Sequence, residues 1–161
     1  MRRIICAPGN AGTAGLAVNF PVKATDLEGI VALAQREKVD LVVVGPDDPL
    51  AAGLVDRLQA AGIRAFGPTA SAARFEASKS FAKDFMLRHG IPTAKAEKFT
   101  DFAAACDYAR GQNYPLVVKA DGLALGKGVT IVENFSEAER ALRESLVDKV
   151  FGEAGNTVVI E

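Results

Sequence analysis

The stretch that decides the fold reads LVVKADGLALGKGVTIV and occupies residues 116–132. Lys119 lies at the end of its first apolar run, and Lys127 lies in the glycine-spaced turn between that run and the second one. Short apolar runs joined by glycines are typical of neighbouring strands. Glycines let backbone N–H groups approach a ligand closely, and lysines beside such groups suit phosphate. The stretch therefore predicts a hairpin, either one that covers phosphates or an ordinary one with solvated lysines.

A Walker A loop is the nearest alternative for this stretch, and the sequence fails its pattern. Too few residues separate Gly122 from Gly126, and Gly128 stands where the hydroxyl that binds magnesium should be. An apolar β-branched run follows the loop where the motif requires a helix. A dinucleotide-binding domain is also disfavoured, because no G-x-G-x-x-G follows the first strand.

Composition excludes several classes of protein. The 161 residues are 49% hydrophobic and 24% charged with a net charge of −1, and no basic stripe marks a nucleic-acid interface. No apolar run approaches the roughly 20 residues of a membrane helix, and residues 1–4 are not followed by the apolar region of a signal peptide. We therefore expect a globular cytoplasmic protein of one or two small domains, with neither nucleic acid nor a membrane as its partner.

The sequence offers few residues for metal binding or nucleophilic catalysis. Cys6 and Cys106 lie far apart without metal-ligand spacing, as expected of buried thiols in a reducing compartment. His89 is the only histidine and stands where a helix is expected to end, which is an ordinary place for a cation. A histidine metal site or a catalytic triad is therefore not expected.

The first part of the chain alternates strands and helices, which is typical of a parallel α/β layer. A capping box at 25–28 predicts the start of one helix, and Asp48 followed by Pro49 predicts the start of the next. With only three strands, this sheet is expected to be thin. The expected strands are 3–6, 41–44 and 64–66, and the expected helices are 25–34 and 50–61.

The second part has a different order of elements. One helix is expected over 69–89 with Lys79 in its middle, and Gly90 and Pro92 end it. The order that follows, β-α-β-β-α-β, is a split βαβ unit with the glycine hairpin at its centre. Its expected elements are a strand at 94–99, a helix capped by Thr100 that ends before Gly111, strands at 116–119 and 129–132, a helix begun by a capping box at 136–139, and a strand at 157–160.

An ordered set of motifs resembles a known family. The motifs are Ala7-Pro8-Gly9-Asn10-Ala11-Gly12-Thr13, Gly45-Pro46 with Pro49-Leu50, Phe66-Gly67-Pro68-Thr69, Glu76-x-Ser78-Lys79-x-Phe81-x-Lys83, His89-Gly90-Ile91-Pro92-Thr93, Val118-Lys119-Ala120-Asp121-Gly122-Leu123-Ala124, Gly126-Lys127-Gly128-Val129 and Val158-Val159-Ile160-Glu161. Each motif is weak alone, whereas the ordered set is specific. With this set the chain resembles the glycinamide ribonucleotide synthetases, also called phosphoribosylamine–glycine ligases, which are ATP-grasp enzymes of purine synthesis, and the resemblance spans essentially its whole length.

The resemblance implies an α/β fold that is incomplete at both ends. Residues 1–69 would form a partial parallel, Rossmann-like pre-ATP-grasp layer that lacks its first strand. Residues 70–93 would be a helical connector, and residues 94–161 the lid of the ATP-grasp fold.

The resemblance also implies a reaction and its small molecules. ATP would phosphorylate glycine, and the amine of 5-phosphoribosylamine would attack the glycyl phosphate, giving glycinamide ribonucleotide. Mg²⁺ or Mn²⁺ would be needed, with its ligands and the glycine site in the part of the fold beyond Glu161, so that this chain would hold no metal and would not turn over alone. The resemblance assigns ATP contacts to Lys79, Lys119, Gly122, Gly126, Lys127, Gly128 and the backbone of Glu161, and ribose-phosphate contacts to Gly9, Asn10, Gly45 and Pro46.

Two other functions remain open at this point. The chain could be a non-catalytic nucleotide-binding fragment, or it could belong to another ATP-grasp carboxylate–amine ligase. Asp47 stands where family members usually carry glutamate. The oligomeric state is not predicted.

Overall fold

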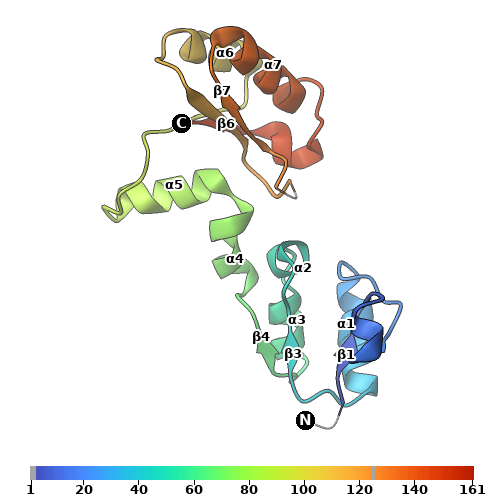
Figure 1. The fold of residues 1–161 in the computed structure, drawn as a ribbon. Helices are drawn as coiled ribbons and strands as arrows, with labels where there is room; N and C mark the ends of the chain where they lie inside the picture. The colour runs from blue at the N-terminus through green and yellow to red at the C-terminus, as the bar shows by residue number, and fades with distance from the viewer. Residues whose placement is uncertain (1–2, 125) are drawn as a thin grey trace. The chain divides into compact units, whose positions relative to one another are not determined.

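The computed structural model describes residues 3–124 and 126–161, and Figure 1 shows their fold. The chain divides into two compact units, with the division between Ala73 and Arg74. Both units combine strands and helices, so the predicted α/β class is confirmed. No helix in the described ranges has the length and apolar character needed to cross a membrane. The three-part division at residues 69 and 93 stays a prediction.

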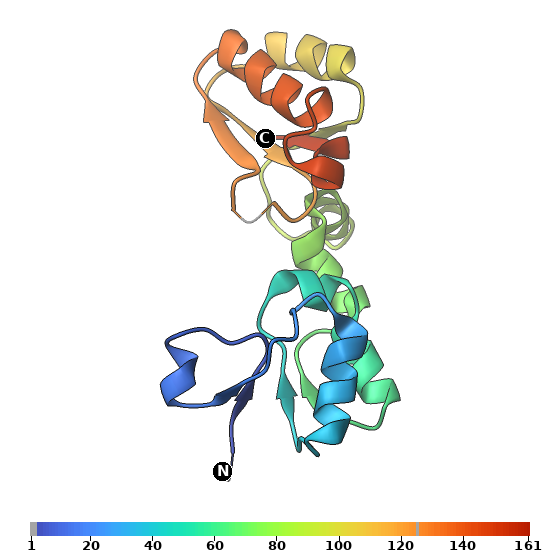
Figure 2. The same ribbon diagram turned by 90° about the vertical axis from the view of Figure 1, so that its right-hand side faces the viewer.

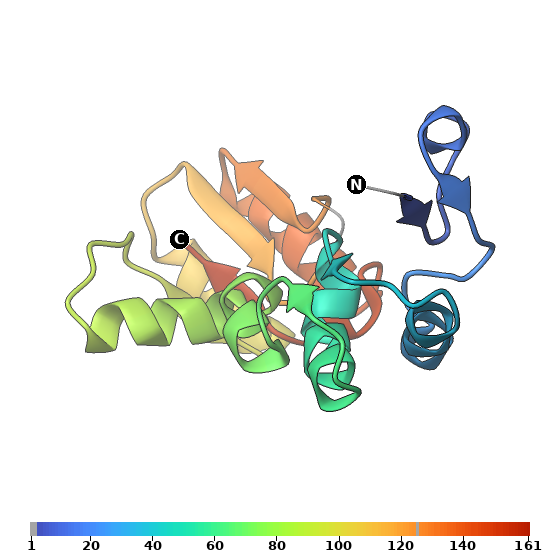
Figure 3. The same ribbon diagram turned by 90° about the horizontal axis from the view of Figure 1, so that it is seen from below.

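The first unit contains two small parallel sheets in place of the single thin sheet that was expected. Strand β1 (Ile5–Cys6) pairs with β2 (Val18–Asn19), which was not predicted, and the short helix η1 (Thr13–Gly15) lies between them in the sequence. Figure 3 shows β1 and β2 side by side. Strand β3 (Val42–Val43) pairs with β4 (Ala65–Phe66). The short strand β2 escaped prediction because two residues carry no periodic pattern.

Three helices cover this unit, and Figure 2 shows α1 beside α3. They are α1 (Leu27–Arg36), α2 (Asp47–Ala51) and α3 (Leu54–Ala60). The continuous helix expected over 50–61 is wrong, because Gly53 adopts a left-handed φ of 87° between α2 and α3. The predicted N-cap at Asp48 is also wrong, since α2 begins at Asp47 and its N-cap is Pro46, two residues earlier.

The helix expected over 69–89 is likewise two helices, α4 (Ala70–Ala77) and α5 (Lys79–Arg88). Ser78 separates them in an extended conformation, with φ −142° and ψ 109°. Its hydroxyl accepts a hydrogen bond from the Phe81 N–H at 3.1 Å, which makes Ser78 the N-cap of α5. Lys79 is therefore the first residue of a helix, and its predicted position in the middle of one is wrong.

The second unit is built on a four-stranded sheet in the order β5-β8-β6-β7, with every neighbouring pair antiparallel. The predicted β-α-β-β-α-β order and the glycine hairpin are both confirmed. Figure 1 shows α6 and α7 together on one side of this sheet and α5 on the other. The elements are β5 (Glu97–Phe99), α6 (Phe102–Arg110), β6 (Leu116–Ala120), β7 (Val129–Val132), α7 (Phe135–Leu146), η2 (Gly152–Asn156) and β8 (Val158–Ile160).

The two faces of β6 differ in character. Leu116, Val118 and Ala120 are buried, and the first two belong to the apolar cluster that α6 and α7 share with the sheet. Because side chains alternate along a strand, Val117 and Lys119 lie on the opposite face. Both side chains are partly buried. The Lys119 side chain therefore leaves β6 on the face of the sheet that α6 and α7 do not cover.

The N-caps of α6 and α7 lie one and two residues away from the predicted positions. Asp101, and not Thr100, caps α6, because its carboxylate accepts from the Ala104 N–H at 2.8 Å. In α7, Asn134 accepts from the Glu137 N–H at 3.0 Å, and the Glu137 carboxylate accepts from the Glu133 N–H at 2.9 Å. Asn134 is therefore the N-cap of α7, and Glu137 reaches back to the N–H of the residue before it, so the capping box predicted at 136–139 is wrong.

We expect Asn134→Ala to lower the free energy of unfolding of the protein by about 1 kcal/mol, the typical loss for an N-cap. Ser136→Ala is the matched control: Ser136 is exposed, and its change should stay within about 0.5 kcal/mol. Urea denaturation followed by circular dichroism measures both values. Equal effects of the two substitutions would contradict the observed cap.

Candidate ATP-phosphate site

The first turn of α5 is tied to the loop that follows β6. The Asp121 carboxylate accepts from the Ser80 N–H at 2.5 Å and from the Ser80 hydroxyl at 2.9 Å, and the Ser78 hydroxyl donates to it at 3.2 Å. The Lys79 N–H donates to the Asp121 carbonyl at 3.1 Å. The N-terminal N–H groups of a helix have no partner within it, and a carboxylate there also suits the helix dipole. Asp121 therefore joins the strand that carries Lys119 to the helix that carries Lys79.

The ammonium of Lys79 points back onto the same loop. Its Nζ donates to the Gly122 carbonyl at 3.2 Å. Burial lowers the pKa of Lys79 from its ordinary value, and the positive charge of Lys119 lowers it further, while Asp121 and Glu76 act in the opposite direction. Lys79 is thus a partly desolvated cation within electrostatic reach of a second one, and a bound anion would relieve both penalties.

Lys119 is held by a carboxylate that bridges two lysines. Its Nζ lies 2.6 Å from Glu161 Oε2, and Lys83 Nζ lies 2.7 Å from Glu161 Oε1. Burial on its own would raise the pKa of Glu161, but the hydrogen bonds and charges of Lys119 and Lys83 outweigh it and hold that pKa below its ordinary value. The carboxylate is therefore ionised at neutral pH.

The glycine loop is closely packed at its start. A Cβ on Gly122 would lie 2.8 Å from Cα and Cβ of Ala154, and the Gly122 N–H donates to the Ala154 carbonyl at 3.2 Å. Gly126 has a left-handed φ of 74°. A Cβ on Gly128 would lie 2.8 Å from that of Ala124. Leu125, which falls within the predicted flap, lies outside the described residues.

Lys127 and Glu161 are the other predicted ATP contacts. Their backbone groups make different hydrogen bonds within the protein. The Lys127 N–H closes a turn on the Ala124 carbonyl at 2.8 Å. The Glu161 N–H donates to the Val117 carbonyl at 2.9 Å, and its carbonyl accepts from the Val117 N–H at 2.7 Å. The main chain of Glu161 is therefore part of the sheet, and its contact with adenine stays a prediction that depends on the second lone pair of its carbonyl.

The residues predicted to hold ribose phosphate lie in the first unit, in the loops after β1 and β3. Asn10 is used within its own loop: its side chain accepts from the Thr13 N–H at 3.0 Å, and its carbonyl accepts from the Asn19 amide at 2.9 Å. Gly9 has a φ of 77°, and a Cβ there would collide with Asn19. Gly45 and Pro46 lead into α2, with Pro46 as its N-cap. Their contact with substrate stays a prediction.

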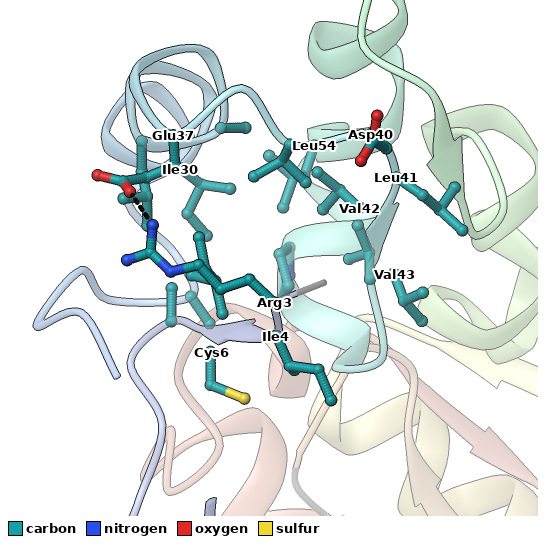
Figure 4. Close-up of a pocket in the computed structure, with 18 of the residues that line it drawn as sticks. Arg3, Ile4, Cys6, Ile30, Glu37, Asp40, Leu41, Val42, Val43 and Leu54 are labelled. Carbon is teal, nitrogen blue, oxygen red and sulfur yellow. Dashed lines mark hydrogen bonds and ion pairs between the residues drawn. The ribbon is translucent and has the colours of Figure 1, made fainter. Parts of the chain in front are cut away.

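A cavity of about 1130 Å³ opens in the first unit between β1 and β3, beside α1 (Figure 4). Its walls are mostly apolar, with Ile4, Leu41 and Val43 among the residues that line it. Arg3 and Glu37 form an ion pair at 2.8 Å on its lining. Of the predicted substrate residues, Pro46 lines it. An apolar cavity whose arginine is already paired offers little to a ribose phosphate, so we do not assign the site to it.

The sequence motifs gave no role to Asp121 and Lys83. In the structure, Asp121 bonds to the first turn of α5, and Lys83 pairs with Glu161. Both stand inside the quoted motifs, but nothing in the sequence shows that a loop carboxylate caps a helix more than 40 positions earlier, or that Lys83 is fully buried and Lys79 only partly. Among the described residues, no group of three or more histidine, cysteine, aspartate or glutamate side chains could hold a metal ion. The expected location of the metal ligands stays a prediction.

Comparisons with known proteins agree on one family. Residues 1–76 match the family model described as phosphoribosylglycinamide synthetase, N domain, and residues 77–161 match the one described as phosphoribosylglycinamide synthetase, ATP-grasp (A) domain. A phosphoribosylamine–glycine ligase from Xylella fastidiosa is 57% identical over 160 residues, which are 98% of this chain and 37% of the relative. The trifunctional purine biosynthetic protein adenosine-3 of Gallus gallus is 51% identical over 164 residues, which cover 100% of this chain and 16% of that protein.

Solved structures of a ligase of this family and of a biotin carboxylase share the fold of this chain. A phosphoribosylamine–glycine ligase from Thermotoga maritima superimposes with a TM-score of 0.74 at 30% identity over 96% of this chain and 36% of its own. A biotin carboxylase from Campylobacter jejuni, solved as a β-γ-ATP complex, superimposes with a TM-score of 0.77 at 26% identity over 99% of this chain and 39% of its own. The chain thus spans little more than a third of the ligases it matches. It belongs to the phosphoribosylglycinamide synthetase family, since residues 1–76 match the N domain of that family and residues 77–161 match its ATP-grasp domain.

Proposed function

We propose that this chain provides the triphosphate-binding part of an ATP-dependent carbon–nitrogen ligase that joins glycine to 5-phosphoribosylamine. The observation that carries the proposal is the arrangement of Lys79 and Lys119, two partly buried cations on α5 and β6, beside the loop that begins at Gly122. Cations and positioned N–H groups are what phosphoryl transfer needs, because charge spreads over the phosphate oxygens as the reaction proceeds.

The proposed reaction proceeds in two balanced steps. A glycine carboxylate oxygen attacks the γ-phosphorus of ATP, which gives glycyl phosphate and ADP. The amine of 5-phosphoribosylamine then attacks the acyl carbon, forms the amide, loses a proton and releases phosphate. In both steps Lys79 and Lys119 stay protonated and bind phosphate oxygens, and neither transfers a proton.

We propose that these residues by themselves bind ATP but do not catalyse the ligation. A divalent cation, Mg²⁺ or Mn²⁺, supplies charge neutralisation on the phosphates in such ligases, and the described residues do not bring three ligands for it together. Gly9, Asn10, Gly45 and Pro46 are proposed to contact the ribose phosphate. A cytoplasmic location fits the two free cysteines, Cys6 and Cys106.

Calorimetric titration with ATP tests the proposal, and proton uptake gives it a specific signature. The pKa of Lys79 is lowered in the free protein, and a bound phosphate would raise it. At an alkaline pH between the two values, binding should therefore take up protons, and the observed heat should change with the ionisation enthalpy of the buffer. The phosphates of ATP are fully ionised at that pH, since their last pKa is about 6.

Lys79→Arg is the matched variant for this titration. An arginine keeps the cation but does not deprotonate, so proton uptake should disappear while binding remains. ATP that fails to bind, with or without Mg²⁺, would contradict the proposed function. Binding whose heat is the same in all buffers would contradict the assignment of Lys79 as a phosphate contact.

A further inference from the structure

Lys83 is a buried lysine whose hydrogen-bonding capacity is fully used. It lies on α5 with 8% of its surface exposed. Its Nζ contacts Glu161 Oε1 at 2.7 Å, the Thr93 hydroxyl at 2.7 Å and the Ala94 carbonyl at 3.0 Å. An ammonium has three N–H donors, and three acceptors satisfy them. Lys83 therefore has no donor left for a phosphate, unlike the two lysines of the proposed site.

Glu161 is held from both ends. Its main chain is paired with Val117 in the sheet, and its carboxylate, 12% exposed, places one oxygen on Lys83 and the other on Lys119. A carboxylate fixed in this way has a single orientation. The lysine side chain, by contrast, is a flexible four-carbon stem, which needs an acceptor to hold its ammonium in place.

Lys119 is the group that this arrangement leaves partly free. Among the described residues its ammonium has one acceptor, Glu161 Oε2 at 2.6 Å, so two N–H donors remain. The side chain is 24% exposed. The fixed carboxylate therefore determines where the two remaining donors point.

We propose that Lys83 and Glu161 are positioning residues: Lys83 anchors the Glu161 carboxylate, and that carboxylate aims the ammonium of Lys119 at the phosphates. The consequence for ATP rests on the proposed function, whereas the effect on Lys119 itself does not. Lys83 also offsets part of the negative charge of Glu161, so that this carboxylate opposes the attraction between Lys119 and a bound anion less strongly. The lowered pKa of Glu161 agrees with a carboxylate that stays ionised between two cations.

Glu161→Gln distinguishes positioning from simple charge. The substitution keeps the size of the side chain and removes one negative charge beside Lys119. If Glu161 only neutralised Lys119, its loss would tighten ATP binding. Positioning predicts binding about tenfold weaker, because an amide offers one acceptor oxygen for two ammonium groups and turns an N–H₂ donor toward one of them.

Glu76→Gln is the matched control for charge. Glu76 is an exposed acid whose charge reaches Lys79, and its substitution removes the same negative charge without removing a partner of Lys119. It should leave the dissociation constant for ATP unchanged or slightly lower. Lys83→Met is the second test variant, and it should weaken ATP binding about tenfold with the Lys119 side chain intact.

The experiment has two readouts on the 161-residue chain. In the nucleotide-free protein, the ¹⁵N–¹H signal of the Lys119 ammonium should be protected and distinct in the wild type and in Glu76→Gln, and lost to exchange in Glu161→Gln and Lys83→Met. Backbone ¹⁵N–¹H spectra identify any variant that fails to fold, and the remaining variant then decides the result. ATP titration by calorimetry gives the second readout.

The outcomes test the positioning of Lys119 and the proposed function separately. A protected Lys119 ammonium in Glu161→Gln, or ATP binding by that variant that is unchanged or tighter, would overturn the inference. If the wild type does not bind ATP but the ammonium signals change as expected, the positioning of Lys119 is supported while the proposed function fails.

Discussion

Lys119→Ala is expected to weaken ATP binding by about 10- to 100-fold. The substitution removes from β6 an ammonium that has one protein acceptor, Glu161, and whose two remaining donors we propose to bind the phosphates. A hydrogen bond to a charged group contributes about 1.5–3 kcal/mol, and about 1.4 kcal/mol corresponds to a factor of ten. The Lys79 ammonium remains beside Gly122, so binding should weaken without being abolished.

Lys98→Ala is the control for loss of positive charge. Lys98 also lies on a strand of the same sheet, but it is exposed and pairs with Asp84 on the surface at 2.6 Å. Its loss should change the dissociation constant by less than a factor of two to three, because exposed charges are screened by salt. If both substitutions weaken ATP binding equally, the effect is one of net charge and Lys119 has no specific role.

Stability is measured in parallel, because Lys119→Ala also removes one partner of Glu161. That carboxylate keeps Lys83 at 2.7 Å, so it is not left unpaired. The free energy of unfolding should therefore fall by only about 1 kcal/mol. A much larger loss would mean that the change in ATP binding reflects unfolding.

The sequence predicted the sheet of the second unit because its strands carry a clear apolar pattern. The runs around the glycine hairpin and the spaced apolar positions of α6 and α7 each determine one element, so the order and the hairpin were correct. The N-caps were misplaced by one or two residues, because Thr100 and Asp101 are both good caps. Local sequence does not decide which of two neighbouring caps meets the helix N–H groups.

The break at Ser78 shows what local patterns miss. Residues 69–89 have helical composition throughout, and neither glycine nor proline interrupts them. The chain nevertheless leaves the helix at Ser78, where Asp121 accepts hydrogen bonds from the first turn of α5. This contact joins residues more than 40 positions apart and outweighs helix propensity at Ser78. A single sequence does not reveal such a contact.

The same limit applies to the site. Lysines at positions 79 and 119 could be named from motifs, since each motif marks a residue type at a fixed place. The parts that orient them, Asp121, Lys83 and the side chain of Glu161, act through tertiary contacts. Their residue types are common on protein surfaces, and only the burial of Lys83 and the short distances to Glu161 reveal their function.

Asp121→Ala is expected to lower the free energy of unfolding of residues 74–161 by about 2–3 kcal/mol. The substitution leaves the Ser80 N–H without its acceptor at the start of α5 and removes the acceptor of two hydroxyl groups. Loss of a hydrogen bond to a charged group contributes about 1.5–3 kcal/mol, and loss of a carboxylate at a helix N-terminus about 0.3–1 kcal/mol. Urea denaturation gives the total, and hydrogen exchange should show faster exchange in the first turn of α5.

Two further variants make this test specific. Asp121→Asn keeps one carbonyl oxygen for the Ser80 N–H, and the serine hydroxyls can rotate to accept from its amide, so it should lose less than half as much stability as Asp121→Ala. Asp84→Ala removes an acid from the exposed side of the same helix, where its pair with Lys98 should contribute less than about 1 kcal/mol. If Asp121→Ala is no more destabilising than Asp84→Ala, then Asp121 does not fix the start of α5, and another contact must hold Lys79 beside the loop.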